Sequence, residues 1–221
     1  MNKKILIYLL IVVVLFCLIF KNKYNLLIGK IISNKVISFS DDFTSNYIDE
    51  LENDIKEYKD ISNIKDCINA SVIYRNPVYW YDEFIIDKGI KDGIEKGYTV
   101  INDKGIVGFV KDVHDNYSRI SLITNISANN KITVGIKADE TIYGIISNYD
   151  KLKDEIIVSE LTTTIENGNY DVITANYTDL KSGIIIGKVK NIIDDSNGLS
   201  KNAVVKPIVN YNDIRYVCVI K

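Results

Sequence analysis

The stretch Glu83–Val113, EFIIDKGIKDGIEKGYTVINDKGIVGFVKDV, alternates short β-branched runs with glycines. Glycine allows a positive φ or the close approach of two backbones, so glycines between such runs indicate turns and tight strand contacts. The segment Asn102–Gly105 separates two β-branched runs and is typical of a β-hairpin. We therefore interpret the stretch as the entry to a small β-barrel, with structural turn glycines at Gly89, Gly93, Gly97, Gly105 and Gly108.

The same kind of pattern continues over residues 69–221. Eleven of the twelve glycines lie after residue 88, so the composition itself marks a boundary. The segments Arg119–Ile123 and Lys131–Lys137 alternate apolar and polar residues, as half-buried strands do. About a dozen short strands separated by turn residues are predicted, which favours a sandwich or a pair of small barrels of about six strands each. The strand order stays open, and one arrangement inserts one barrel into the other.

An apolar run, Ile5–Phe20, lies between two pairs of lysines near the N-terminus. At 1.5 Å per residue it reaches roughly 24 Å, short of the roughly 30 Å hydrocarbon core, and Tyr24 could extend the helix. We therefore predict a transmembrane anchor over residues 5–24, preceded by a short tail of residues 1–4. A cleaved signal peptide is the alternative, but no small-residue cleavage site follows Phe20. The flanking charges do not set the orientation.

Residues 25–68 have the apolar spacing of a helix. Over about two heptads the spacing becomes that of a coiled-coil seam, which predicts a helical stalk that pairs with a second copy. An amphipathic helix lying on the barrel of its own chain is the alternative. The residues predicted to mediate dimerisation are Ile48, Leu51, Ile55 and Tyr58.

The residues that could carry chemistry are few. The only histidine, His114, lies in a turn, and no glycine-rich oxyanion loop surrounds the nearby Ser118, so a serine-protease triad is not supported. Cys17, Cys67 and Cys218 lack the spacing of a zinc site, and Cys67 and Cys218 could form a disulfide or stay as two free thiols, the simpler interpretation. We expect no catalytic residues, cofactor or metal. A net charge of -2 also argues against nucleic acid.

An aromatic group, Tyr79, Trp80 and Tyr81, follows the Asn76-Pro77 turn. We expect it to plug the space between helix and barrel, and an exposed contact patch is the alternative.

Several motifs resemble the bacterial cell-shape-determining MreC family. They are Ala70–Pro77, Asp87-Lys88-Gly89 with Gly93, Gly105–Val110, Ser121–Thr124, Lys206-Pro207, and a second glycine segment Gly183–Val189 with turn glycines Gly183 and Gly187. The helix segment Leu51–Asn53 is also similar to the family. The chain departs at Asn176, where the family has glycine, and at Lys181-Ser182, where it has Phe-Pro.

The resemblance implies a mainly β protein with an N-terminal transmembrane helix, a coiled-coil stalk and two small barrels. It implies a single-pass protein of the cell membrane, with its bulk extracellular and residues 1–4 cytoplasmic. Its function would be a non-enzymatic scaffold that organises peptidoglycan synthesis during cell elongation. The implied partners are a second copy, penicillin-binding transpeptidases, MreD-like and MreB-linked components, and membrane lipid around the anchor. The alternative function is an adaptor subunit of an export system, which usually has a helical hairpin between β-segments.

Overall fold

The computed structural model describes residues 15, 20, 21, 35, 44–127, 131–176, 180–194 and 200–221. The predicted anchor, residues 5–24, lies almost wholly outside this part of the chain. Among the described residues there is no helix both long and apolar enough to cross a membrane. Residues 44–62 are helical. The chain divides into two compact units, residues 1–55 and 56–221, and the second contains all the described strands.

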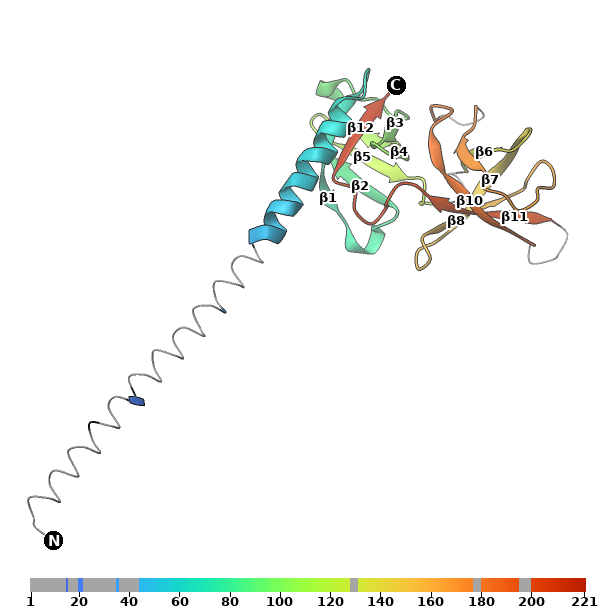
Figure 1. The fold of residues 1–221 in the computed structure, drawn as a ribbon. Helices are drawn as coiled ribbons and strands as arrows, with labels where there is room; N and C mark the ends of the chain where they lie inside the picture. The colour runs from blue at the N-terminus through green and yellow to red at the C-terminus, as the bar shows by residue number, and fades with distance from the viewer. Residues whose placement is uncertain are drawn as a thin grey trace, which may run out of the picture. The chain divides into compact units, whose positions relative to one another are not determined.

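The β region alternates short strands with tight turns and two single-turn 3₁₀ helices (Figure 1). In chain order the elements are β1 (Ile68–Arg75), η1 (Pro77–Tyr79), β2 (Glu83–Ile86), η2 (Ile90–Asp92), β3 (Thr99–Ile101), β4 (Ile106–Val113), β5 (Ser118–Leu122), β6 (Thr133–Lys137), β7 (Thr141–Asp150), β8 (Glu155–Ser159), β9 (Asp171–Thr174), β10 (Ile185–Asp194), β11 (Lys201–Pro207) and β12 (Tyr216–Ile220).

These strands close into two antiparallel barrels of six strands each. The first barrel has the order β1-β12-β3-β4-β5-β2, and the second has the order β10-β11-β8-β7-β6-β9. Strand β12 lies between β1 and β3 in the first barrel, although it follows every strand of the second (Figure 1). The second barrel is therefore inserted between β5 and β12 of the first. The predicted pair of six-strand barrels is confirmed, and the insertion is the arrangement that the structure adopts.

Strand alternation supplies the apolar interior of each barrel. In the first barrel Phe84 and Ile86 of β2 are buried, and in the second Val134 and Ile136 of β6 are buried. Burial of such β-branched and aromatic side chains supplies the main driving force for folding. The alternation predicted for Lys131–Lys137 therefore reports the inward face of β6.

The predicted hairpin at Asn102–Gly105 joins β3 to β4. The Asn102 side-chain oxygen accepts hydrogen bonds from the backbone N–H groups of Lys104 and Gly105, each at 3.0 Å. The Asn102 N–H donates in turn to the Gly105 carbonyl at 2.9 Å. The asparagine side chain thus takes the place of a backbone group in the turn. The hairpin could therefore be recognised from these four residues alone.

The cysteine pair departs from the simpler expectation of two free thiols. Cys67 and Cys218 form a disulfide, with their Cα atoms 5.6 Å apart. That separation lies within the usual range for disulfides. The bond joins the segment between the helix and β1 to strand β12, across 151 positions of sequence.

Candidate functional site

The junction between the two barrels is built around three tyrosines from distant parts of the chain. Tyr81 follows η1 in the first barrel, Tyr149 lies in β7 of the second, and Tyr211 lies in the segment that links β11 to β12. The ring centroids of Tyr81 and Tyr149 are 5.5 Å apart, and those of Tyr149 and Tyr211 are 6.2 Å apart. Such tilted and edge-on contacts are favourable aromatic geometries. The cluster therefore couples both barrels to their connecting segment.

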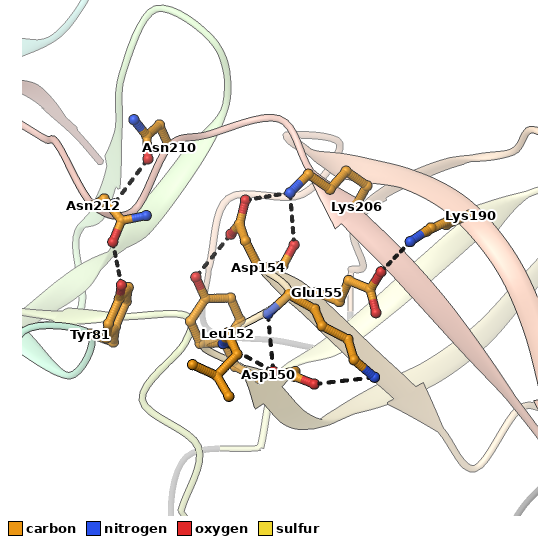
Figure 2. A network of polar contacts seen from close by, with 11 residues as sticks. Tyr81, Asp150, Leu152, Asp154, Glu155, Lys190, Lys206, Asn210 and Asn212 are labelled. Carbon is orange, nitrogen blue, oxygen red and sulfur yellow. Dashed lines mark hydrogen bonds and ion pairs between the residues drawn. The ribbon is translucent and has the colours of Figure 1, made fainter.

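A polar network centred on Asp154 holds the Tyr149 hydroxyl, and Figure 2 shows Asp154 beside Lys206. The Tyr149 hydroxyl donates to Asp154 Oδ1 at 2.9 Å, and Lys206 Nζ lies 2.6 Å from Asp154 Oδ2. Burial raises the pKa of the Tyr149 phenol well above its usual range, and the hydrogen bond to Asp154 adds to the effect. The phenol is thus held neutral as a donor, and Asp154 is held between a hydroxyl and an ammonium group.

The turn that connects β7 to β8 is stabilised by hydrogen bonds between its own residues. Asp150 Oδ1 accepts hydrogen bonds from the N–H groups of Leu152 and Lys153, at 3.0 and 3.1 Å (Figure 2). These bonds lower the pKa of the Asp150 carboxyl, and the bond from the Lys153 backbone N–H has the largest effect. Leu152 is 99 % exposed at this tip. Lys151 Nζ lies 5.4 Å from the centroid of the Tyr81 ring.

On the first barrel, Arg75 organises the loop that follows β1. Its guanidinium lies 4.3 Å from the Trp80 ring centroid, in cation–π geometry. Its Nε and Nη2 donate to the Trp80 carbonyl at 2.9 and 2.6 Å, and Nη2 also donates to the Tyr211 carbonyl. Burial lowers the pKa of Arg75 to about 10.

The aromatic group at Tyr79–Tyr81 was expected to plug the space between helix and barrel. Instead, Trp80 Nε1 donates to the Asn212 carbonyl at 3.1 Å, and the Tyr81 hydroxyl bonds the Asn212 side chain (Figure 2). Two members of the group thus pack on the segment between the barrels, while Tyr79 is 52 % exposed. The sequence gives no hint of Asn212 as their partner.

An open groove of about 410 Å³ runs beside this loop. It is lined by residues 71–75 of β1, by Trp80, and by residues 212–216. Four exposed apolar side chains lie on β1 and η1, namely Ile73 and Tyr74, which line the groove, and Val78 and Tyr79 of η1. We call these four residues the β1–η1 patch. Its chemistry suits contact with another protein rather than a reaction.

The barrels also approach each other through backbone. A Cβ atom added at Gly105 would lie 2.4 Å from the Ile185 carbonyl oxygen of β10. The Lys181 N–H donates to Thr99 Oγ1 of β3 at 2.8 Å. The glycine predicted as a turn residue therefore also permits close contact between the two barrels.

The other predicted glycines divide into two kinds. Gly93, Gly97 and Gly183 have positive φ, at 86°, 89° and 80°. The remaining three lie where an added Cβ would meet backbone closer than 3.0 Å, namely Gly89, Gly108 and Gly187. All seven therefore have a conformational or a packing reason to be glycine, and the structure spreads them over both barrels instead of gathering them into one site.

The predicted dimerisation residues lie on the helix of residues 44–62. Ile48, Leu51, Ile55 and Tyr58 are 48, 42, 53 and 51 % exposed, unlike Ile61, which is 1 % exposed. The Tyr58 ring makes an edge-on contact with Tyr216 of β12, with centroids 5.5 Å apart. Tyr58 thus packs partly on the first barrel of its own chain. The alternative interpretation, an amphipathic helix lying on that barrel, expected such packing from all four residues.

His114 and Ser118, the residues considered for catalysis, make structural contacts at a turn. The His114 ring stacks on Tyr117 with centroids 4.4 Å apart, and the Ser118 hydroxyl donates to the Lys88 carbonyl at 2.8 Å. Across residues 44–127 and the later described segments, no group of three or more His, Cys, Asp or Glu side chains could hold a metal.

Comparison with known proteins identifies the family to which this chain belongs. The model of the family described as "Rod shape-determining protein MreC, barrel core" matches residues 72–221. The "Cell shape-determining protein MreC" of Listeria monocytogenes is 31 % identical over 173 residues, which cover 76 % of this chain and 59 % of that protein. The protein of the same description from Bacillus subtilis is 31 % identical over 188 residues, 78 % of this chain and 65 % of its own. The chain thus spans about three fifths of the length of these relatives.

Solved structures agree with this assignment. The structure described as "MreC Lysteria monocytogenes" has a TM-score of 0.65 at 28 % identity, and the match covers 80 % of this chain and 89 % of that one. A complex between Penicillin-Binding Protein (PBP2) and MreC from Helicobacter pylori has a TM-score of 0.52 at 15 % identity, covering 70 % and 99 %, and shares the fold. The family match includes both barrels and the strand β12 that closes the first. The chain is a member of the MreC family of rod shape-determining proteins.

Proposed function

We propose that this chain is a membrane-anchored extracellular scaffold of the cell-elongation machinery, and that it controls cell shape by organising peptidoglycan synthesis enzymes. The observation that carries the proposal is the family match over residues 72–221, which contains both barrels and their junction. Relatives that share this region are named for the determination of cell shape.

The proposed partners are inferred from the exposed β1–η1 patch and from one related protein. The related MreC of Helicobacter pylori is found in a complex with Penicillin-Binding Protein (PBP2). The β1–η1 patch of this chain exposes Val78 and Tyr79, and its other members, Ile73 and Tyr74, line an open groove. Exposed apolar surface of this kind is what a protein partner covers. We assign penicillin-binding transpeptidases as partners, together with MreD-like and MreB-linked elongation components.

The proposal includes the anchor and the stalk. Residues 5–24 would cross the cell membrane and contact lipid, with residues 1–4 in the cytoplasm and the rest of the chain outside. Residues 25–68 would form the stalk and 69–221 the paired barrels. The exposed side chains of Ile48, Leu51 and Ile55 support a seam that pairs two copies. A homodimer or higher assembly would then present two sets of barrels to the wall enzymes.

The scaffold acts by binding and not by catalysis. His114 is engaged with Tyr117, and the neighbouring Ser118 hydroxyl is directed at a backbone carbonyl. The family match also argues against the export-adaptor alternative, because it assigns both barrels to a family named for rod shape.

In-cell crosslinking of the full chain tests the proposal. A photo-crosslinking amino acid is placed at Tyr79 in the β1–η1 patch, and in a second variant at Ile90 of η2, which is 58 % exposed. We expect capture of a penicillin-binding transpeptidase from the Tyr79 position and much less from the Ile90 position.

Equal capture of the transpeptidase at both positions would keep the scaffold function but place the binding surface elsewhere. Recovery of an ATP-driven transporter or an outer channel, without any wall-synthesis enzyme, would overturn the proposal.

A further inference from the structure

The Cys67–Cys218 disulfide lies at the end of a short strand ladder. Strand β1 pairs with β12 through four residue pairs, starting at Ile68↔Val219 and Asn69↔Cys218. From Val72 onward the pairs of β1 are with β2, and this pairing has a register shift between Val72 and Tyr74. The helical residues 44–62 precede this ladder in the chain, so a pull along the helix acts on the pair at Ile68 once the contact of Tyr58 with Tyr216 has opened.

Such a ladder is weak against peeling, because its hydrogen bonds break one after another from the loaded end. A covalent bond at that end prevents the first step. We propose that the Cys67–Cys218 disulfide is a clamp that keeps β1 paired with β12 when the stalk is pulled. Without the clamp, opening of the first pairs would uncover the buried Val217 and Val219, both of which belong to the barrel core.

The placement of the two sulfurs fits this role. Cys218 is 0 % exposed, and Cys67 is half-buried, so the bond is shielded on one side by the barrel. The two cysteines are also 151 positions apart in sequence, and every strand from β1 to β11 lies between them. Formation of the bond therefore connects the entrance of the barrel region with the strand that completes it.

Formation of the clamp is an oxidation. The two thiols lose two protons and two electrons as the sulfur–sulfur bond forms, and a disulfide-bearing thiol oxidant accepts them and is reduced to two thiols. Such oxidants act outside the reducing cytoplasm, so this step rests on the proposed extracellular placement. The clamp itself depends only on the fold.

Hydrogen exchange on the purified full chain tests the clamp. All samples carry Cys17→Ser, so that only the two paired cysteines remain. Exchange is compared between the oxidised chain, the same chain reduced with a thiol reductant, and a Cys67→Ser variant. We expect amides of residues 68–71 and 216–219 to exchange about tenfold faster or more in both open forms. Amides of the β7–β8 pairing, such as Ile145↔Ser159, serve as the internal control and should not change.

Two results would overturn the inference. One is equal exchange at residues 68–71 in the oxidised and reduced chains. The other is full alkylation of both thiols in chain isolated from cells under non-reducing conditions, detected by peptide mass. The reduced natural pair needs no substitution at Cys67, so misfolding of the variant would not obscure the answer. No wall enzyme takes part in the exchange assay, so the clamp can fail while the crosslinking of the proposed function succeeds.

Discussion

The Tyr211 hydroxyl donates a 2.8 Å hydrogen bond to the carbonyl of Ile106, a residue 105 positions earlier in the chain. Both residues are 0 % exposed. Tyr211 lies between the strand that leaves the second barrel and the strand that completes the first, and Ile106 begins β4 of the first. This bond helps to fix the returning segment on the first barrel, together with the Arg75 bond to the Tyr211 carbonyl and the Trp80 bond to Asn212, while the Tyr211 ring contacts Tyr149 of the second.

Tyr211→Phe should lower the free energy of unfolding by about 1–3 kcal/mol, because the buried Ile106 carbonyl loses its donor while the ring stays in place. Chemical denaturation of the full chain measures the change. Tyr79→Phe is the matched control, since Tyr79 is 52 % exposed, and it should change stability by less than about 0.5 kcal/mol. Equal effects of the two substitutions would contradict the assigned role of Tyr211.

Stability should fall on the alkaline side because of Tyr149. Burial raises the pKa of its phenol in the folded chain, whereas an unfolded tyrosine ionises near pH 10. Above that pH the unfolded state holds fewer protons than the folded state, so stability decreases as the pH rises, and the full contribution is present below it. In Tyr149→Phe the decline between about pH 9.5 and 11 should be shallower.

Urea unfolding at successive pH values compares the two slopes. Burial also raises the pKa of Tyr211, so a residual decline is expected in the variant. Parallel curves for the parent and the Tyr149→Phe chain would show that the phenol of Tyr149 is not held neutral by its surroundings.

Gly105→Ala should destabilise the contact between the barrels. Its Cβ would lie 2.4 Å from the Ile185 carbonyl oxygen, so one backbone must move, at a cost of about 1–3 kcal/mol. Gly183→Ala separates this crowding from backbone strain, because Gly183 has φ +80° and no atom within 4 Å of the added Cβ. Its cost should be about 1–2 kcal/mol.

Thermal unfolding measures both glycine variants. The two are distinguished by a third substitution, asparagine, which tolerates positive φ. Gly183→Asn should recover much of the loss, and Gly105→Asn should not. Recovery at Gly105 would mean that its conformation, and not the approach of Ile185, requires glycine there.

Charged substitutions in the predicted seam should weaken self-association and leave the barrels folded. Leu51→Lys with Ile55→Lys would place two like charges per copy in the paired helices, and we expect the dissociation constant to rise roughly tenfold or more. Sedimentation of the full chain in detergent measures the mass. Glu52→Lys, on the exposed surface of the same helix, should have little effect. An unchanged mass in the double variant would exclude this seam as the dimer contact.

The strands could be predicted because their signals are local. The alternation around Val134 and Ile136 reports the inward face of a strand wherever that strand lies in the sheet. The Asn102–Gly105 hairpin is local as well, since one side chain satisfies the turn. Both features could therefore be predicted from the sequence without knowing how the barrels close.

The junction could not be predicted, because its members meet only after both barrels close. Nothing near Tyr149 or Tyr211 distinguishes them from the other thirteen of the fifteen tyrosines. The cysteine pair has the same limitation. Cys67 and Cys218 become neighbours only when the register sets Asn69 opposite Cys218, and no periodicity of either segment encodes that pairing.

The insertion of one barrel into the other imposes an order on biosynthesis. Strands β6 to β11 are contiguous, so the second barrel has all its strands while β12 is still being synthesised. Until Tyr216–Ile220 emerges, β1 and β3 lack the strand that lies between them, and the interior of the first barrel stays open. A ribosome that stalls before Tyr216 therefore releases a chain with the strands of one complete barrel and one exposed apolar interior, a form that is prone to aggregation.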